Sequence, residues 1–547
     1  MPITALDLLC AAIAAWLAIG AAGLAIANRV RLISRVLFPA GALVGVLIAL
    51  VAFTAIAAPA QTRILPFGLP DLPFHLRVDA LSAFFLLLLG ATSAAVSVYS
   101  AGYFRAGEGA SPGLLCFQYH AFLAAMALVL VADDAYAFMV AWEAMALASF
   151  FLVTTDHRIA EIRRAGYLYL LIAHIGAIAI LLAFGTLKGG GDYTFASMRT
   201  AGLDAGWASV AFFLALTGFG AKAGVMPLHV WLPEAHPAAP SPVSALMSGV
   251  MLKTAIYGLL RVTFDLLSLQ LWWWGVVALA LGLATALFGV IFAAVQTDMK
   301  RLLAWSSIEN IGILVAGIGL AVLFKAYGKP ALAAIAMTAV LYHALNHALM
   351  KSLLFLATGS VLHATHERSL GRLGGLARRM PWVASLALVG VLAIAALPPL
   401  NGFVSEWLLI QAFLFTPSNL MSNDHVGATL IEDERDVYYD AGVRLKSSQR
   451  GRPETLRVGF ALRFSPDRLF RGSYDSVLID RSEGVGYGQR EMLIEQVMNH
   501  AGSVPASYSI STCSGRVRIS FIPATKLSSV AVYTSASAPG VDVPSTQ

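Results

Sequence analysis

Residues 218–261 read GFGAKAGVMPLHVWLPEAHPAAPSPVSALMSGVMLKTAIYGLLR, and this stretch places two lysines within apolar sequence. Pro227 and Pro233 follow Lys222 and lack backbone donors, which predicts an interruption of the helix. Irregular backbone at membrane depth persists only where it is buried in protein or lines a hydrated cavity. Lys253 lies near the middle of the next apolar run, where snorkelling to the membrane surface explains it less well than it explains Lys222. The stretch therefore predicts a broken membrane helix beside buried positive charge.

The composition of the whole chain is that of a membrane protein. Its 547 residues are 58% hydrophobic and 12% charged, with a mean hydropathy of +0.74, which soluble domains of this size do not normally show. Windows of about 20 apolar residues give about 12 spans. Their expected limits are 3–27, 36–58, 79–101, 115–132, 134–154, 165–187, 206–230, 241–263, 271–295, 301–322, 331–361 and 383–418. The predicted fold class is an all-α polytopic membrane protein with a polar C-terminal tail.

This tail differs in composition from the rest of the chain. From residue 423 onward, charged residues are denser and no apolar run is long enough to cross a bilayer. The segments RVRISFI (516–522) and VAVYT (530–534) alternate as strands do. Residues 419–547 are interpreted either as a small appended domain or as a poorly structured, non-native ending, and the second interpretation is preferred.

Basic residues in the loops predict the orientation. The loops that contain Arg29–Arg35, Arg158–Arg164, Lys300–Arg301 and Arg368–Arg379 lie on one side and hold more basic residues than the loops on the other side. The positive-inside rule places these loops in the cytoplasm, and the N-terminus in the periplasm of a bacterial inner membrane. The first span is too long, and lacks the basic start, for a cleaved signal peptide.

Carboxylates inside the expected spans point to ion transport. A charge at the bilayer centre costs at least ~2.5 kcal/mol on insertion scales and by default marks an ion pathway or a buried pair. Glu143 lies in VAWEAMALASFFLV and can alter the proton affinity of Lys222 by moving toward it, or can simply pair with a neighbouring helix. Glu309 lies among Ser306, Ser307 and Asn310, which offer the alternative of a structural polar cluster.

The segment YHALNHALMK, residues 342–351, spaces His343, His347 and Lys351 four residues apart. On a helix the three share one face and extend over about 12 Å, roughly 40% of a hydrocarbon core about 30 Å thick. Because histidine can take up a proton at one nitrogen and release one from the other, this row has the layout of a proton relay. A lysine in the third position disfavours zinc, and polar helix packing is the remaining alternative.

A second interruption is predicted by LPPLNG, residues 397–402, and Glu406 follows it. Two interrupted helices with buried charges are typical of internally duplicated transporters. His229 and His236 flank the first interruption, either as members of the pathway or as loop residues at the membrane interface. His174 is alone on an apolar helix and is interpreted as a packing residue more readily than as a relay member.

Other chemistries lack their motifs in this sequence. Cys10, Cys116 and Cys513 form no CxxC pair and no metal-finger spacing, so neither a disulfide framework nor an iron–sulfur cluster is predicted. The glycines of GFGAKAG follow no expected strand and are not interpreted as a nucleotide-binding loop. We expect no cofactor or metal in this chain, no redox catalytic site of its own, and no nucleic-acid partner.

Several motifs occur together in the order of a known family: RVDALSAFF, WEAMALASFFLV, KAGVMPLHVWLPEAHPAAPSPVSALMSGVMLKTAIYGLLR, DMKRLLAWSSIENIG, HALNHALMKSLLFLATGSV and LPPLNGFVSEWLL. Over most of residues 70–415 the chain resembles the proton-pumping antiporter-like subunits of complex I, Mrp-type antiporters and membrane-bound hydrogenases. Within this family it is most similar to the branch of hydrogenase-4 component B and formate hydrogenlyase subunit 3.

The resemblance implies two inverted repeats of five helices, each with one broken helix. N-terminal helices would occupy residues 1–114, the first repeat 115–263 and the second repeat 264–418. Since the chain turns polar after Phe415, the second repeat is expected to be incomplete.

The resemblance also implies roles for the charged residues. Glu143 and Lys222 would form the switching pair of the first half-channel, and Glu406 the exit of the second. Lys253 would form the central hydrophilic axis together with the row His343, His347 and Lys351.

The function expected from this resemblance is proton translocation by a membrane subunit of a redox-driven complex. That complex would be a hydrogenase of the hydrogenase-4 or formate hydrogenlyase type, or an assembly like NADH:quinone oxidoreductase. Partners would be other membrane subunits, redox subunits with metal clusters, and the lipid bilayer. The alternatives are a subunit of an Mrp-type cation/proton antiporter and a truncated subunit that is inactive or serves only as a scaffold.

Overall fold

The computed structural model describes residues 3–104 and 111–414, together with six strands between residues 426 and 534. The chain divides into two units, Met1–Phe415 and Thr416–Gln547. Because they are separate units, each is described by itself.

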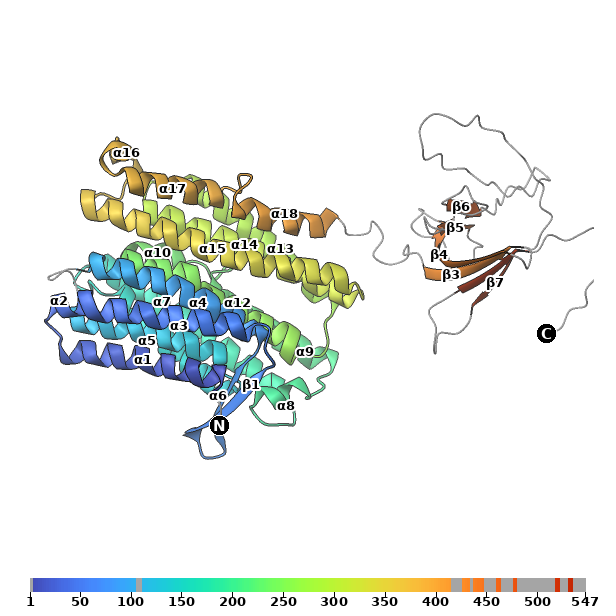
Figure 1. Ribbon diagram of the computed structural model, residues 1–547, viewed down its shortest axis with the longest axis horizontal. Helices are drawn as coiled ribbons and strands as arrows, with labels where there is room; N and C mark the ends of the chain where they lie inside the picture. Colours follow the sequence, from blue (N-terminus) through green and yellow to red (C-terminus); the bar gives the residue numbers. More distant parts are fainter. Residues whose placement is uncertain are drawn as a thin grey trace, which may run out of the picture. The chain divides into compact units, whose positions relative to one another are not determined.

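The first unit is a bundle of membrane helices (Figure 1). Within the described residues, 11 helical stretches are long and apolar enough to cross a bilayer. The helices are α1 (Ala5–Ala25), α2 (Val30–Leu32), η1 (Ile33–Leu37), α3 (Phe38–Ala55), α4 (Ala80–Tyr103), α5 (Pro112–Val131), α6 (Ala135–Val153), α7 (Ala160–Leu187), α8 (Phe195–Arg199), α9 (Ala205–Ala223), α10 (Leu232–Ala238), α11 (Ser241–Leu246), η2 (Met247–Met251), α12 (Leu252–Leu260), η3 (Arg261–Leu266), α13 (Trp272–Ala294), α14 (Met299–Ala326), α15 (Pro330–Thr365), η4 (Leu370–Arg372), α16 (Leu376–Arg379), α17 (Pro381–Ile394) and α18 (Asn401–Leu414). The predicted class, an all-α polytopic membrane protein, is confirmed.

Both predicted interruptions are present. Helix α9 ends at Ala223, and Gly224 caps it with a φ of 85°, a conformation that glycine adopts without the steric cost of a Cβ atom. Helix α10 begins only at Leu232. The twelfth expected span is divided between α17 and α18, which lie one after the other along α15 (Figure 1). Prolines at both places remove backbone donors, which explains why sequence alone located the breaks.

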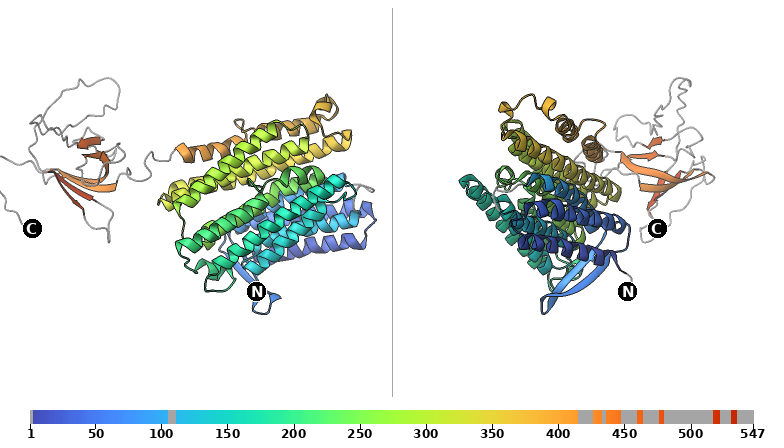
Figure 2. Two further views of the ribbon diagram at one scale, coloured as in Figure 1. Left: turned by 180° about the vertical axis from the view of Figure 1, so that it is seen from behind. Right: turned by 60° about the vertical axis from the view of Figure 1, so that its left-hand side comes forward.

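A β-hairpin between α3 and α4 was not predicted. Strands β1 (Gln61–Leu69) and β2 (Leu72–Val78) pair antiparallel, with a register shift between Leu65 and Gly68. The hairpin projects from the bundle at the end where the N-terminus lies (Figure 2). Several prolines interrupt the alternation that identifies strands, so the segment has the composition of a loop. Asp79, directly after β2, caps α4 by accepting a hydrogen bond from the backbone of Ser82.

The stretch Ser241–Leu266 is the central helix of the bundle. Its most apolar window is buried over all its residues, so it has no face toward lipid. Two π-helical segments, η2 and η3, interrupt its α-helical hydrogen bonding. Such segments are frequent at functional sites because they leave carbonyl groups free for other donors. Lys253 follows η2 by two residues.

Helices α13 and α14 pack through glycines that recur every seven residues. Gly275, Gly282 and Gly289 line one face of α13 and meet the backbone of α14. A Cβ atom on Gly282 would lie 2.7 Å from the carbonyl oxygen of Gly312. Real Cβ atoms do not come so close to a carbonyl oxygen, so only glycine allows this backbone contact.

We predict that Gly282→Val separates α13 from α14 and lowers the midpoint of thermal unfolding. Overpacking of this kind typically costs about 1–3 kcal/mol. The control is Gly185→Val, since Gly185 is exposed on α7 and its Cβ atom would have nothing within 4 Å. Equal midpoints for the two variants in the full-length chain, measured in one detergent, would contradict the proposed packing.

The second unit contains a six-stranded sheet with the order β6-β5-β4-β3-β8-β7. Its strands are β3 (Val426–Glu432), β4 (Asp436–Lys446), β5 (Gly459–Arg463), β6 (Ser476–Ile479), β7 (Val517–Phe521) and β8 (Val530–Thr534). Strands β3 and β8 pair parallel, and the other neighbours pair antiparallel. The two predicted strands correspond to β7 and β8. The interpretation of this tail as an appended domain or as a non-native ending stays a prediction.

Candidate functional site

Lys222 lies in the last turn of α9, immediately before the first interruption, and is 2% exposed. Its Nζ donates a hydrogen bond of 2.6 Å to the hydroxyl of Tyr169 on α7. The Tyr169 hydroxyl is also 2.5 Å from Ser149 Oγ on α6, and the ammonium group lies 4.8 Å from the centre of the tyrosine ring. A hydroxyl can accept from the lysine while donating to the serine, so three helices meet at one chain of proton-carrying groups.

Glu143 is close to Lys222 but does not form an ion pair with it. The two interact electrostatically, while a Glu143 carboxylate oxygen lies 3.8 Å from Nε2 of His174. The Glu143 side chain is 34% exposed and that of His174 is 52% exposed. The interpretation of His174 as a packing residue is therefore wrong: it lies on the outer face of α7, where no neighbouring helix covers it, and contacts the carboxylate. The alternative that Glu143 pairs with a neighbouring helix describes the observed geometry.

Lys253 is fully buried and connects the central helix to α15. Its Nζ donates to the carbonyl oxygen of Ser248, which belongs to η2, over 2.7 Å. It also contacts Nδ1 of His347. The rings of His347 and His343 stack with centres 6.3 Å apart, and Nδ1 of His343 lies 3.1 Å from Ser405 Oγ on α18. A polar line thus runs from Lys253 to the second interruption.

Lys351 leaves this line although it shares the helix face with the histidines. Its buried Nζ donates to the carbonyl oxygen of Leu303 on α14 over 2.9 Å. Glu309 lies close enough to Lys351 and Glu406 to interact electrostatically with both. Among the described residues, Lys222, Lys253 and Lys351 form no salt bridge, and each donates to a neutral oxygen. The row expected from four-residue spacing therefore divides into two branches.

The predicted polar cluster around Glu309 is only partly present. Ser306 hydrogen-bonds the Glu309 side chain. Ser307 Oγ instead lies 2.8 Å from Ser248 Oγ, and the Asn310 amide donates to the backbone of Ser306. Glu309 is thus available to the charges described above, because only one of the three neighbours binds it.

The two histidines near the first interruption occupy different surroundings. His229 lies in the irregular segment between α9 and α10, half-buried, with its ring 5.3 Å from that of Trp305. His236 is fully buried on α10, and its ring stacks on Phe355 at 4.8 Å. The interpretation of His236 as an interface loop residue is wrong, because α10 continues past the break into the protein interior.

The two clusters are not joined by hydrogen bonds between Lys222 and Lys253 in the described residues. The nearest approach leads from the Tyr169 hydroxyl to the sulfur of Met251, 3.7 Å away and two residues before Lys253. A thioether is a weak acceptor and carries no proton. Transfer between the clusters would therefore need water or a rearrangement of side chains.

The sequence analysis missed a network of ion pairs at the end of the bundle that carries the hairpin. Arg261 is 5% exposed and donates to both carboxylate oxygens of Asp79, over 2.7 and 2.8 Å, and to Asp265 over 3.0 Å. Arg199 on α8 bridges Asp265 and Asp133. The alternation of acidic and basic residues at span ends was the available signal, but their pairing depends on contacts up to 182 residues apart in the chain.

Asp79 lies just outside the membrane span, and its charge is fixed by this network. Burial by itself would raise the pKa of the Asp79 carboxyl. The hydrogen bonds and the positive charge of Arg261 outweigh that effect, so the pKa lies well below its usual value. The ion pairs tie β2, α4 and the central helix together in the charged state.

Metal binding finds no support in the side chains. Within the residues that the structure describes, no group of three or more His, Cys, Asp or Glu side chains is arranged to hold a metal ion.

Together, the interrupted helices and the buried lysine–histidine line define a class of protein, the polytopic membrane proteins with a polar axis inside the bilayer. Residues 132–431 match the family described as NADH:quinone oxidoreductase/Mrp antiporter, transmembrane. The chain belongs to this family.

Curated relatives support this assignment. The chain is 46% identical to hydrogenase-4 component B of Escherichia coli over 359 residues, which cover 65% of this chain and 53% of the relative. It is 36% identical to formate hydrogenlyase subunit 3 of the same organism, with 62% and 54% covered. The A/B component of a probable K⁺/H⁺ antiporter of Rhizobium meliloti is 34% identical, with 61% and 32% covered. The chain thus spans about half the length of the first two relatives.

Solved structures show the same fold. The Mrp complex of Dietzia contains a chain with a TM-score of 0.65 and 29% identity, with 76% of this chain and 44% of that chain covered. The archaeal membrane-bound sulfane sulfur reductase, a respiratory membrane complex, gives a TM-score of 0.61 and 27% identity, with 73% and 64% covered.

Proposed function

We propose that the chain translocates protons as a membrane subunit of a redox-driven complex of the hydrogenase type. The observation that carries the proposal is the set of three buried lysines that face neutral acceptors beside two helix interruptions. A buried amine of this kind can exist with or without its proton, and a nearby carboxylate decides which form is favoured. Charges are kept inside a membrane at high cost only where they serve a pathway or a pair.

The proposed pathway begins at Glu143 and Lys222. Movement of the Glu143 carboxylate from His174 toward Lys222 would stabilise the protonated amine, and its return would favour release of the proton. Tyr169 is positioned to receive that proton and pass it to Ser149, because it contacts both side chains. His229 lies beside the interruption and is a candidate for proton entry.

The proposed pathway continues through the centre and then toward the second interruption. Lys253 and His347 are in contact, and His343 reaches Ser405 at the start of α18. A branch through Lys351 and Glu309 would lead to Glu406. We propose residues 115–263 and 264–418 as the two repeats that carry these half-channels, after N-terminal helices in 1–114.

We further propose a setting for the chain that agrees with the names of its relatives. It would lie in a bacterial inner membrane with its N-terminus in the periplasm, assembled with other membrane subunits. Redox subunits with metal clusters would supply the driving reaction, since this chain is expected to hold no cofactor. The chain itself would contribute the proton path.

The experiment that tests this function reconstitutes the assembled complex in vesicles and follows internal pH during redox turnover. Proton movement that needs the electron donor and acceptor, and no sodium or potassium gradient, is the expected result. Proton movement driven by an imposed potassium or sodium gradient without turnover would instead support the Mrp-type alternative, which one relative's name favours. Turnover without any proton movement would support the inactive scaffold.

We predict that Tyr169→Phe lowers proton translocation several-fold and leaves the chain folded. The variant keeps the ring that contacts Lys222 but removes the hydroxyl between the amine and Ser149. The control is Tyr167→Phe, because Tyr167 lies on the same helix and is 68% exposed. Vesicle acidification at equal protein content is the measurement. Equal rates for the two variants would show that the hydroxyl is not part of the path.

A further inference from the structure

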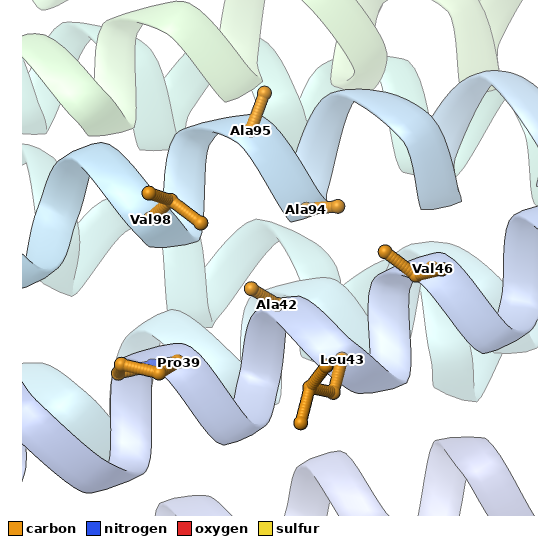
Figure 3. Close-up of a pocket in the computed structure, with 7 residues that line it drawn as sticks. All are labelled: Pro39, Ala42, Leu43, Val46, Ala94, Ala95 and Val98. Carbon is orange, nitrogen blue, oxygen red and sulfur yellow. The ribbon is translucent and has the colours of Figure 1, made fainter.

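A groove with apolar walls lies between α3 and α4 on the surface of the first unit (Figure 3). Its volume is ≈ 450 Å³, within the range of about 300–1,000 Å³ that is usual for small-molecule sites. The lining residues are all apolar: Pro39, Ala42, Leu43, Val46, Ala94, Ala95 and Val98. Leu43 is 72% exposed and Val98 63% exposed, so the groove opens on the face that meets the bilayer.

Three arginines precede this groove on the same continuous helical stretch, Val30–Ala55, or directly before it. Arg29, Arg31 and Arg35 are exposed, and no carboxylate among the described residues pairs with their guanidinium groups. Arg31, Arg35, Pro39 and Leu43 are four residues apart in turn and so lie near one face of the helix. Arg35 is one turn, about 6 Å along the axis, from the first residue that lines the groove.

We propose that an anionic glycerophospholipid binds here, with its phosphate on Arg31 and Arg35 and one acyl chain in the α3–α4 groove. The groove extends from Pro39 to Val46, about 10 Å along the helix, which is most of a leaflet about 15 Å thick. Basic residues at the membrane surface beside a site between membrane helices are typical of binding sites for anionic lipids.

The charge of the site selects this occupant over others. A helix from another subunit would cover the groove but leave the arginines unpaired unless it also carried acidic residues at that depth. A quinone would fill the groove without using the positive charge. Only a molecule with a long apolar chain and an anionic head satisfies both parts of the site, and the bilayer supplies such molecules at high concentration.

The test titrates the full-length chain, purified in mild detergent with its co-purifying subunits, with dioleoylphosphatidylglycerol and with dioleoylphosphatidylcholine. Native mass spectrometry counts the bound lipid. Because each basic residue near the surface contributes about 1 kcal/mol, the double variant Arg31→Gln/Arg35→Gln is expected to bind the glycerol lipid about thirty-fold more weakly. Val46→Phe, which fills the groove from α3, is expected to weaken binding while leaving the arginines in place.

Matched controls separate the site from general lipid attraction. Arg378→Gln/Arg379→Gln removes two exposed arginines of α16, at the same end of the bundle as α2, and should leave binding unchanged (Figure 1). Leu50→Phe enlarges an exposed residue of α3 outside the groove and should do the same.

Four outcomes would overturn the proposal. They are equal binding of the two lipids, equal effects of the two arginine pairs, full binding by Val46→Phe, and equal competition by glycerophosphate, which has no acyl chain. Cross-linking of a cysteine placed at Leu43 to another subunit would also overturn it, because a protein would then occupy the groove. The midpoint of thermal unfolding of each variant shows that a loss of binding does not come from misfolding.

Discussion

Replacing Lys222 with methionine is expected to lower proton translocation by the assembled complex at least about tenfold, since a positioned proton-transfer group typically contributes factors of about 10²–10⁴. Methionine fits the buried space but cannot hold a proton. Redox turnover should remain measurable because this chain is expected to hold no electron carrier. The measurement is vesicle acidification per electron pair transferred.

The same experiment includes Glu143→Gln and a control. Glutamine keeps the size of the carboxylate but cannot favour the charged amine, so the same loss is expected. Lys325→Met removes an exposed lysine at the end of α14 and should have no effect. If Lys222→Met and Glu143→Gln both translocate protons at the normal rate, the proposed first half-channel is wrong.

Arg261→Ala is expected to destabilise the folded chain by about 3–5 kcal/mol, the typical effect of removing one partner of a buried ion pair. The substitution leaves Asp79 and Asp265 without the guanidinium group that neutralises them. It also detaches the central helix from the start of α4. The midpoint of thermal unfolding of the full-length chain is the measurement.

Arg301→Ala is the matched control for this effect. Arg301 also donates to a carboxylate, that of Glu234, over 2.8 Å, but both side chains are more than 40% exposed. Exposed pairs contribute about 0–1 kcal/mol because water screens them and the side chains lose entropy. If the two variants unfolded at the same temperature, the ion-pair network would not hold the helices together as described.

The membrane spans and both interruptions could be predicted because bilayer thickness fixes the length of an apolar run and proline has only a local effect. The alignment of His343, His347 and Lys351 followed from helix periodicity. What periodicity could not give is the partner of each side chain. Lys351 turns to the carbonyl of Leu303, while His343 reaches Ser405, because neighbouring helices decide these contacts.

The incorrect interpretations have the same origin. His174 and His236 have similar apolar neighbours in sequence, yet one is exposed and the other is fully buried. The hairpin between α3 and α4 was missed because its prolines conceal the strand pattern. The network around Arg261 was missed because its members come from separate segments of the chain, which only the fold brings together.

The complete enclosure of the central helix has a consequence for synthesis of the protein. Lys253 contacts His347, which follows it by 94 residues in the chain. At the usual pace of translation, roughly 5–20 residues per second, the lysine waits about 5–20 s before its partner is made. During that interval a charged helix without a lipid-compatible face must be held by the translocon or an insertase. Release of this helix is therefore expected to depend on the emergence of α15, which makes insertion of the bundle a concerted rather than a sequential process.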